Sequence, residues 1–406
     1  MTLQLLLDQG ERSRVLEALE HSLAAGAVVA VITPQERPAL QPVLEADLPL
    51  GLQGPALVLG SGGSRGGRQW CLQPLAHLQQ AAQATAQWLE AIGLEPGQCE
   101  LFDPLPLHHI SGVMPWIRAR LWGAGLRCLS PELMRDPQRL AEQEPVSADR
   151  EALLSLVPTQ LERLLGHPEG VRWLQGFAVV WVGGAALNDS QAQRCRARGI
   201  RLAPCYGSTE TAAMVTALPP EAFLRGVAGC GHSLPHADVR LDPSSAALQV
   251  RSASLALARF QAGCWQPLPQ ADGWWSSGDR AELALEGLQV LGRLDGAIQS
   301  GGETVFPDQV EAQLLALCRR QGLPVEELLL LPQADPLWGE RLVALVRPLD
   351  QASFPSLELQ LQAMVQPLPP AQRPRRWLEC PALQRNAMGK WERQSWQRWL
   401  ALLEAA

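Results

Sequence analysis

The sequence predicts an α/β protein with more than one domain, and three observations support this expectation. The chain has 406 residues, which exceeds the size at which a single hydrophobic core usually stops growing. Residues 177–182 form a continuous apolar run, which is typical of a strand buried in a parallel sheet. Residues 309–318 instead carry apolar side chains at helical spacing. Strands and helices are therefore both expected, around at least two hydrophobic cores.

The composition indicates a globular protein of the cytoplasm. Hydrophobic residues make up 47% of the chain and charged residues 18%, and no apolar run is long enough to insert into a membrane. The N-terminus carries acidic residues and no basic segment, unlike a signal peptide. The nine cysteines form no C-x-x-C pair, which indicates reduced thiols and no zinc site. The net charge of −7 argues against a nucleic-acid partner.

Three residue types are so rare that their few members need an explanation. Among 34 basic residues the only lysine is Lys390, and the only tyrosine is Tyr206. Asparagine occurs only at Asn188 and Asn386. Because arginine and tryptophan supply charge and bulk elsewhere, we expect Lys390, Tyr206 and Asn386 to have specific roles.

The first chemically suggestive element is a loop rich in glycine and serine. An apolar strand is expected at 56–59 and a helix at 74–92, and the loop between them runs through residues 60–68. Strand, loop and helix in this order cradle phosphate groups with backbone N–H groups and hydroxyls. The loop does not match the pattern G-x-x-x-x-G-K-[ST]. A flexible surface loop is the alternative interpretation.

A histidine segment, P-L-H-H-I-S-G at 106–112, comes next. It precedes a helix expected at 113–121, which contains Arg118. A single histidine is more often structural than catalytic, so His109 alone predicts little. The planar guanidinium of Arg118 suits the recognition of a carboxylate.

Two strands then lead into loops that suit a nucleotide. Residues 177–182 end at Gly183-Gly184, and a second strand, at 201–204, leads into C-Y-G-S-T-E-T at 205–211. Ligands of open α/β sheets bind at the carboxyl ends of such strands. An aromatic ring, a glycine, two hydroxyls and a carboxylate suit adenine, phosphate and a magnesium ion. The alternative is a capped helix that begins at Ser208.

A glycine-rich stretch, L-G-R-L-D-G-A-I-Q-S-G-G-E-T-V-F-P, occupies residues 291–307. Arg293 and Asp295 lie on a polar turn within it. The pair Gly301-Gly302 can adopt positive φ or let a ligand approach the backbone closely. A plain glycine-rich hairpin is the alternative interpretation.

Two shorter segments complete the pattern. W-W-S-S-G-D at 274–279 places a carboxylate after a glycine, and N-A-M-G-K-W-E-R at 386–393 places Lys390 on a glycine turn. The alternative for Lys390 is a solvated surface lysine.

Taken together and in this order, the motifs resemble those of the adenylate-forming enzymes. This superfamily contains acyl- and aryl-CoA ligases, luciferases and the adenylation domains of peptide synthetases. The resemblance covers residues from about 56 to 393 of this sequence. It implies a large N-terminal domain of mixed β-sheets flanked by helices at 1–292, a hinge at 293–296 with Asp295 as its centre, and a small mobile α+β domain at 297–406.

The resemblance also implies roles for the matching residues. ATP would be bound by Ser61, Gly62, Ser64, Arg68, Gly183, Gly184, Tyr206, Gly207, Ser208, Thr209, Asp279 and Arg293. Catalysis would involve Lys390, His109 and Glu210, and Glu210 would also hold Mg²⁺. The acid would contact Arg118, Thr159 and Ser208, and the CoA channel would be lined by Gly301 and Gly302. The phosphate loop departs from the family pattern at Gly63, in place of a threonine, and at Arg65, in place of a glycine.

Within the superfamily, the spacing between His109 and Arg118 and the segment L-V-P-T-Q-L at 156–161 are similar to those of the o-succinylbenzoate:CoA ligases. The implied reaction joins an acid to CoA through an acyl-AMP intermediate, with ATP and Mg²⁺, on the route to menaquinone or phylloquinone. Another acyl- or aryl-CoA ligase is one alternative. A nucleotide-binding relative without turnover is the other, because of the altered phosphate loop. The identity of the acid, homo-oligomerisation and rates stay open.

Overall fold

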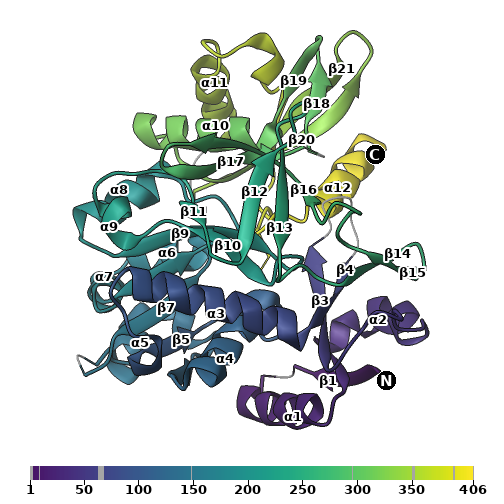
Figure 1. Ribbon diagram of the computed structural model, residues 1–406. Helices are drawn as coiled ribbons and strands as arrows, with labels where there is room; N and C mark the ends of the chain where they lie inside the picture. The colour runs from purple at the N-terminus through teal and green to yellow at the C-terminus, as the bar shows by residue number, and fades with distance from the viewer. Residues whose placement is uncertain are drawn as a thin grey trace.

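The computed structural model describes residues 3–8, 10–62, 68–147, 149–294, 296–349, 353–386 and 389–405. Four β-sheets organise these residues, with helices between and around them (Figure 1). The first three sheets are built from residues before 294 and the fourth from residues after 296. Within the described ranges, no helix combines the length and apolarity needed to cross a membrane.

The first sheet has the strand order β1-β2-β3-β4-β14-β15. Its first three strands are parallel and its last three are antiparallel to their neighbours. The strands are β1 (Leu3–Leu7), β2 (Val28–Ile32), β3 (Ala56–Gly62), β4 (Arg68–Pro74), β14 (Ala258–Gln261) and β15 (Cys264–Pro267). The helices between them are α1 (Arg12–Ala24) and α2 (Arg37–Leu44).

Strand β4 corrects one sequence-based expectation. It runs antiparallel to β3 with Gly62 opposite Arg68, so the glycine-rich loop is the connection of a β-hairpin. Helix α3 (Leu75–Ala91) confirms the helix expected at 74–92, but β4 precedes it, so the expectation that the loop leads directly into this helix was wrong. Trp70, Cys71 and Leu72 are all buried because both faces of β4 are covered. Such a strand shows no alternation of apolar and polar residues from which it could be recognised.

The second sheet has the order β11-β10-β9-β8-β7-β5-β6 and is parallel from β6 to β9. Its strands are β5 (Glu100–Asp103), β6 (Gly125–Cys128), β7 (Ala152–Leu156), β8 (Val179–Val182), β9 (Leu202–Ser208), β10 (Ala213–Ala217) and β11 (His232–Ser233). The helices connecting them are α4 (Ile110–Trp122), α5 (Pro137–Gln143), α6 (Pro158–Leu165), α7 (Pro168–Gln175), α8 (Asp189–Ala197) and α9 (Pro220–Leu224). The apolar run expected to be a buried parallel strand is β8.

Helices cover both faces of the second sheet. Val180 and Val182 of β8 point into a core formed with α5, α6, α7 and α8. Val179 and Trp181 point into the opposite core, formed with α3 and α4. The other side of α3 and α4 packs on the first sheet and α1. These two helices therefore lie between two sheets, which fixes α4 and its buried side chains firmly.

The third sheet is antiparallel with the order β12-β13-β16-β17. Its strands are β12 (Ala237–Leu241), β13 (Ala247–Ser252), β16 (Trp275–Ala284) and β17 (Gly287–Arg293). One face packs against Tyr206 and Val215 of the second sheet. The third sheet therefore stands beside the carboxyl ends of β8 and β9.

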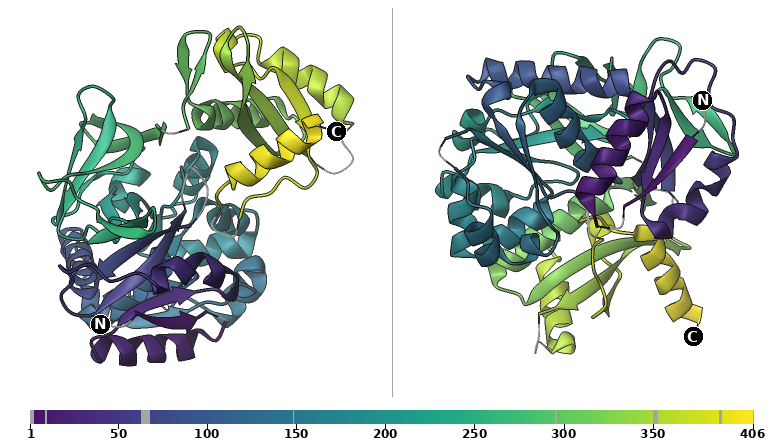
Figure 2. Two further views of the ribbon diagram at one scale, coloured as in Figure 1. Left: turned by 90° about the vertical axis from the view of Figure 1, so that its right-hand side faces the viewer. Right: turned by 90° about the horizontal axis from the view of Figure 1, so that it is seen from below.

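The residues after 296 gather around the fourth sheet (Figure 2, green to yellow). Its strands are β18 (Ile298–Ser300), β19 (Glu303–Val305), β20 (Val325–Asp335), β21 (Gly339–Pro348) and β22 (Arg376–Glu379). Helices α10 (Pro307–Gln321) and α11 (Phe354–Met364) cover one face, and α12 (Arg393–Ala405) covers the other. Short 3₁₀ helices occur at η1 (Pro34–Glu36), η2 (Pro96–Gln98), η3 (Leu133–Arg135) and η4 (Pro370–Gln372).

Candidate active site

The carboxyl ends of β8 and β9 form one wall of the candidate site. A Cβ atom at Gly183 would lie only 2.9 Å from the sulfur of Cys205, and Gly184 has a φ of 80°. A Cβ atom at Gly207 would lie 1.8 Å from the carbonyl oxygen of Ala213. Glycine is therefore required at all three positions, for close approach or for positive φ. The backbone they leave open lies where α/β sheets bind ligands.

Ser208 ends β9, and β10 returns antiparallel to it. The structure thus excludes the alternative of a capped helix beginning at Ser208. The turn between the strands holds Ala212 and Ala213 at φ values of 54° and 72°, which non-glycine residues rarely adopt. Thr211 stabilises this turn, because its hydroxyl accepts from the Ser208 amide at 2.8 Å and donates to the Ala213 carbonyl at 2.6 Å. Strained backbone of this kind clusters at functional sites, and nothing in the sequence indicated it.

Tyr206, Asp279 and Arg293 meet at the junction of the second and third sheets. The Tyr206 hydroxyl donates to Oδ2 of Asp279 at 2.5 Å. Arg293 lies directly across the strand pair from Asp279, with Nη1 3.4 Å from Oδ1, and it also donates to the Ser277 carbonyl at 3.0 Å. Burial, followed by the Asp279 charge, raises the pKa of Tyr206 well above its ordinary value. Tyr206 therefore stays neutral and donates to the carboxylate.

The residues after Tyr206 present polar groups to the same site. Ser208 has a buried hydroxyl without a hydrogen-bond partner among the described residues. Thr209 and Glu210 are nearly buried, with exposed fractions of 9% and 8%. Gln73 Nε2 donates to the Thr209 carbonyl at 2.7 Å, which holds the turn between β9 and β10 in place. The orphaned Ser208 hydroxyl is the kind of group that a bound ligand satisfies.

Ser61, the first of the predicted phosphate-loop residues, lies at this site as well. It is buried at the end of β3, and both its hydroxyl and the Glu210 carboxylate interact with the thiol of Cys71. Burial raises the pKa of Cys71 well above its ordinary value, and Glu210 adds to the shift while Ser61 opposes it. The neutral thiol of Cys71 therefore interacts with both Ser61 and Glu210.

The only lysine enters the site from the other end of the chain. The Lys390 ammonium lies near enough to the carboxylates of Glu210 and Asp279 and to the guanidinium of Arg293 for their charges to shift its pKa. Lys390 keeps exposed surface, yet the surrounding protein atoms desolvate its ammonium and so lower its pKa from 10.5. The two carboxylates oppose this shift and Arg293 adds to it. Lys390 is itself exposed, so the alternative of a surface lysine stays open and its role remains a prediction.

A small turn holds Lys390 in place and explains Asn386. The Asn386 side chain accepts from the Lys390 amide at 3.0 Å, and the Asn386 amide donates to the Lys390 carbonyl at 2.9 Å. Gly389 has a φ of 70°, and a Cβ atom there would lie 2.7 Å from the Thr159 side chain. Thr159, at the start of α6, therefore contacts the lysine turn itself.

A buried carboxylate supports the segment that follows. Glu311 on α10 is 5% exposed and accepts from Trp391 Nε1 at 2.6 Å, from Arg393 Nη2 at 3.0 Å and from the Leu330 amide at 3.1 Å. Arg385 lies over the Trp391 ring at 4.2 Å. Sequence analysis missed Glu311, because its partners lie about 80 residues further along the chain, at separations of 80 and 82.

Arg118 and His109 are both carried by α4. His109 is the N-cap residue and Arg118 lies two turns further on, with an exposed fraction of 3%. A Cβ atom at Gly112 would lie 2.2 Å from the Pro106 carbonyl, so the first turn of α4 packs directly on the preceding loop. No hydrogen bond or ion pair joins Arg118 to another described residue, and its Nε atom is an orphan.

The surroundings of Arg118 contain further unpartnered polar atoms. Its guanidinium lies 5.2 Å from the centre of the Trp181 ring, whose Nε1 is buried without a partner. Both ring nitrogens of His236 are also buried without partners among the described residues. Burial lowers the pKa of Arg118 to about 10, and burial followed by the Arg118 charge lowers the pKa of His236 to about 4. A neutral imidazole and a buried cation whose Nε has no partner among the described residues thus lie in the same region, which suits an anionic ligand.

Several predicted residues lie elsewhere or outside the described ranges. Gly301 and Gly302 have φ values of 59° and 84° at the β18–β19 turn, as their residue type allows. A Cβ atom at Gly301 would lie 2.5 Å from the Trp338 ring, so Gly301 packs within the fourth sheet, whereas a Cβ atom at Gly302 would meet no described atom within 4 Å. Ser64, with the rest of 63–67, and the hinge residue Asp295 lie outside the described residues. For Gly62 and Arg68 only the backbone pairing at the hairpin is described.

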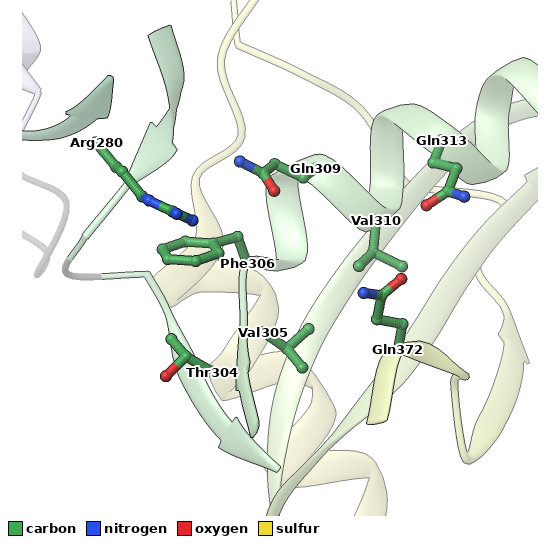
Figure 3. A pocket seen from close by; sticks show the side chains of 8 residues that line it. All are labelled: Arg280, Thr304, Val305, Phe306, Gln309, Val310, Gln313 and Gln372. Atoms are coloured by element: carbon green, nitrogen blue, oxygen red, sulfur yellow. The ribbon is translucent and has the colours of Figure 1, made fainter. Parts of the chain in front are cut away.

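A second pocket, which the sequence did not indicate, lies where the third and fourth sheets meet (Figure 3). Its volume is about 250 Å³. The Arg280 guanidinium on β16 points toward Phe306, 4.9 Å from the ring centre. Gln309, at the start of α10, donates to the Leu291 carbonyl on β17. The pocket is lined by Arg280, Thr304, Val305, Phe306, Gln309, Val310, Gln313 and Gln372.

Comparisons with known proteins agree with this arrangement. A family model described as AMP-binding enzyme matches residues 74–250. The 2-succinylbenzoate–CoA ligase of Escherichia coli is 32% identical over 324 residues, which are 80% of this chain and 65% of that protein. This chain therefore spans slightly less than two thirds of the length of that relative.

Two solved structures show how far the fold is shared. Wild-type E. coli MenE with a bound analogue of OSB-AMS has a TM-score of 0.71 and 25% identity, covering 99% of this chain and 88% of that one. MenE from Bacillus subtilis in complex with ATP and magnesium ion has a TM-score of 0.70 and 20% identity, covering 98% and 79%. The expected mixed α/β architecture is thereby confirmed across nearly the whole chain. Residues 74–250 thus match the AMP-binding enzyme family, and the chain shares the fold of these MenE structures.

Proposed function

We propose that this protein is an ATP-dependent acid:CoA ligase that converts o-succinylbenzoate into its CoA thioester. The observation that carries the proposal is the convergence of Lys390 with Glu210, Asp279 and Arg293 in one site. A cation, two carboxylates and a guanidinium, drawn from the second sheet, the third sheet and the segment before α12, match what adenylation needs. The match of residues 74–250 to the AMP-binding enzyme family and the similarity to the E. coli ligase support the same reaction class.

In the first half-reaction, a carboxylate oxygen of the acid attacks the α-phosphorus of ATP. The bond from that phosphorus to the leaving pyrophosphate breaks, and acyl-AMP forms. Asp279 and Arg293 would hold the ribose hydroxyls, and the ring of Tyr206 would lie against adenine. Lys390 would stabilise the negative charge that builds up between the acid and the α-phosphate, because a desolvated ammonium interacts strongly with an anion.

The residues present fit a magnesium ion. Glu210 is a nearly buried oxygen donor beside the orphaned Ser208 hydroxyl, and hard oxygen ligands suit Mg²⁺. The ion would neutralise charge on the phosphates when ATP is bound. The B. subtilis structure with ATP and magnesium ion supports this assignment by its shared fold. In this chain, Glu210 would hold the ion, and Ser208 would donate to a phosphate or acid oxygen.

Arg118 supports o-succinylbenzoate in particular. This acid carries two carboxylates, and only one of them reacts. A buried guanidinium without an ion pair is costly unless an anion completes it, so Arg118 suits the carboxylate that does not react. Neutral His236 and the Trp181 N–H add unpartnered groups to the same region.

The second half-reaction would need a different arrangement of the fourth sheet. The CoA thiol attacks the acyl carbon of acyl-AMP and AMP leaves. Lys390 lies in the site while Gly301 packs on Trp338, which supports a rotation of residues 297–406 about a hinge at 293–296. The contact between Arg280 and Phe306 would break during this rotation, because it joins the third sheet to α10.

Acid-dependent exchange of labelled pyrophosphate into ATP tests the first half-reaction. We expect exchange with o-succinylbenzoate and Mg²⁺, and little with simple fatty or aryl monocarboxylates. Exchange with a different acid from such a panel would reassign the substrate and keep the reaction class. Binding of ATP without exchange for any acid would instead indicate a nucleotide-binding relative without turnover.

A further inference from the structure

A residue of the N-terminal segment, Arg12, forms hydrogen bonds with the loop that carries His109. Arg12, the first residue of α1, donates from Nη1 to the carbonyls of Leu105, at 2.7 Å, and Asp103, at 3.2 Å. Its Nη2 donates to the Gly112 carbonyl at 3.2 Å and forms an ion pair with the Asp103 carboxylate. Asp103 is fully buried and the Arg12 side chain is 16% exposed.

Asp8, which precedes Arg12 in the chain, forms a second contact with the same loop. Asp8, just after β1, accepts a hydrogen bond from His108, with 3.1 Å between Oδ2 and Nδ1. The His108 ring in turn lies against the His109 ring, with 4.4 Å between the ring centres. The hydrogen bond from His108 is also the largest of the causes that hold the pKa of Asp8 below its ordinary value.

The contacts of Arg12 reach both ends of the loop that carries His109. Leu105 and Gly112 lie on either side of the His109 loop, so one guanidinium joins both ends of it. The loop folds back tightly here, because a Cβ atom at Gly112 would lie 2.5 Å from the Leu105 carbonyl. Arginine suits this role, since its planar fork presents several donors in fixed directions.

An ordinary structural ion pair is the competing explanation for Arg12. Arg14, on the same helix, provides an example of one, because its pair with Glu11 joins side chains that are 80% and 63% exposed. Arg12 differs in binding three backbone carbonyls of a segment 91 to 100 residues further along the chain. That segment runs from the end of β5 to the first turn of α4, the helix of Arg118.

Asp103 also connects Arg12 to the predicted acid site electrostatically. Burial raises the pKa of Asp103 to about 7, and the charges of Arg12 and then Arg118 oppose this shift. The Asp103 carboxylate therefore interacts with the charges of both Arg12 and Arg118. Neither Arg12 nor Asp8 belongs to the motifs that carried the family resemblance.

We propose that Arg12, with Asp8 as a second anchor, is a positioning residue that sets His109 and Arg118 for the two ends of a dicarboxylic acid. This inference rests on the proposed function, because it assumes that Arg118 binds the carboxylate that does not react. Arg12 itself does not touch the acid. It fixes the loop and the first turn of α4, and a displacement of about 1 Å at such a site can reduce the rate about 100-fold.

The test compares Arg12→Lys and Arg12→Met with Arg14→Met as the matched control. Lysine keeps Asp103 paired, so the protein folds, but a single ammonium cannot reproduce the fork across Leu105 and Gly112. The measured quantity is the ratio of kcat/KM for o-succinylbenzoate to kcat/KM for 4-oxo-4-phenylbutanoate, which lacks the aromatic carboxylate. We expect Arg12→Lys to lower this ratio about tenfold or more and to leave the KM for ATP unchanged, and Arg14→Met to change neither.

A merely structural Arg12 would lower both kcat/KM values by the same factor, and this result would overturn the inference. Hydrogen–deuterium exchange gives a second readout that needs no substrate. Amides of residues 105–112 should exchange faster in Arg12→Lys than in Arg14→Met, and equal protection would also overturn it. If the wild type itself shows no preference for the dicarboxylate, the proposed substrate fails, and the exchange measurement still tests the grip of Arg12 on the loop.

Discussion

Replacing Arg118 by methionine should shift stability and substrate preference in opposite directions. In the ligand-free protein Arg118 is a buried cation with no ion pair among the described residues. Methionine has a similar length and carries no charge, so it removes the cost of burying the cation. It also removes the group proposed to bind the second carboxylate of the acid.

The magnitude of the stability change follows from the pKa. Burial lowers the pKa of Arg118 from 12.5 to about 10, which corresponds to about 3 kcal/mol against the cation in the folded, ligand-free state. The folded pKa is the lower one, so this cost is fully present below pH 10 and disappears as pH rises toward the unfolded value. Loss of the contact with the Trp181 ring offsets about 1 kcal/mol. The variant should therefore gain about 2 kcal/mol, or about 2 °C in Tm for a chain of 406 residues.

The change in affinity has the opposite sign. Two charge-assisted hydrogen bonds to a carboxylate contribute about 1.5 kcal/mol each, and their loss should raise the KM for o-succinylbenzoate about 150-fold. The KM for ATP should not change, because the interaction is confined to the acid. Arg118→Lys should restore little, since a point charge does not replace the fork.

Calorimetry of the ligand-free protein and initial rates with both substrates measure the two effects. Arg120→Met is the matched control, because Arg120 lies on the same helix in an ion pair with Glu20 whose side chains are 52% and 45% exposed. We expect the control to change neither quantity appreciably. An Arg118→Met protein that melts at a lower temperature and keeps its preference for the dicarboxylate would refute the reasoning. Arg118 would then be a structural residue.

Four further perturbations test the rest of the site. Lys390→Ala should slow acid-dependent pyrophosphate release about 10²–10³-fold while thioester formation from supplied acyl-AMP persists. As pH rises, the wild-type adenylation rate should begin to fall before pH 10.5, because desolvation lowers the pKa of this ammonium and it loses its proton earlier. Trp391→Phe removes the 2.6 Å donor to buried Glu311, so it should destabilise the folded protein by about 1–3 kcal/mol in chemical denaturation and slow adenylation more than thioester formation. Tyr206→Phe should raise the KM for ATP about tenfold in steady-state kinetics, since it loses one hydrogen bond to Asp279, the carboxylate proposed to bind the ribose. Asp295→Pro should keep pyrophosphate release in a single turnover but block thioester formation, because proline restricts φ at the hinge, and quenched-flow analysis should find acyl-AMP accumulating on the enzyme.

Each of these predictions can be contradicted by one specific result. Equal loss of both half-reactions in Lys390→Ala would remove its assignment to adenylation alone. Unchanged denaturation of Trp391→Phe would mean that Glu311 is satisfied without the indole. An unaltered KM for ATP in Tyr206→Phe would separate Tyr206 from nucleotide binding, and wild-type thioester formation by Asp295→Pro would place the hinge elsewhere.

The sequence by itself determined the architecture and the nucleotide loops. Gly183, Gly207 and the residues between Tyr206 and Glu210 act through their position at the end of a strand, which depends on a few neighbouring residues. Such local patterns can be read in order along the chain, and the structure and the family match agree with the α/β fold they predict. The rarity of lysine likewise pointed to Lys390, which the structure brings to the same site.

Tertiary structure alone decided how distant segments meet. The strand β4 escaped sequence analysis because burial on both faces removes the alternation that marks a strand. The contacts of Arg12 with Asp103, and of Trp391 with Glu311, join residues 91 and 80 positions apart. An arginine or glutamate that binds across such a distance looks, in the sequence, like any other charged residue. Its partner is set by the packing of whole sheets and helices, and the pattern of neighbouring residues contains no record of it.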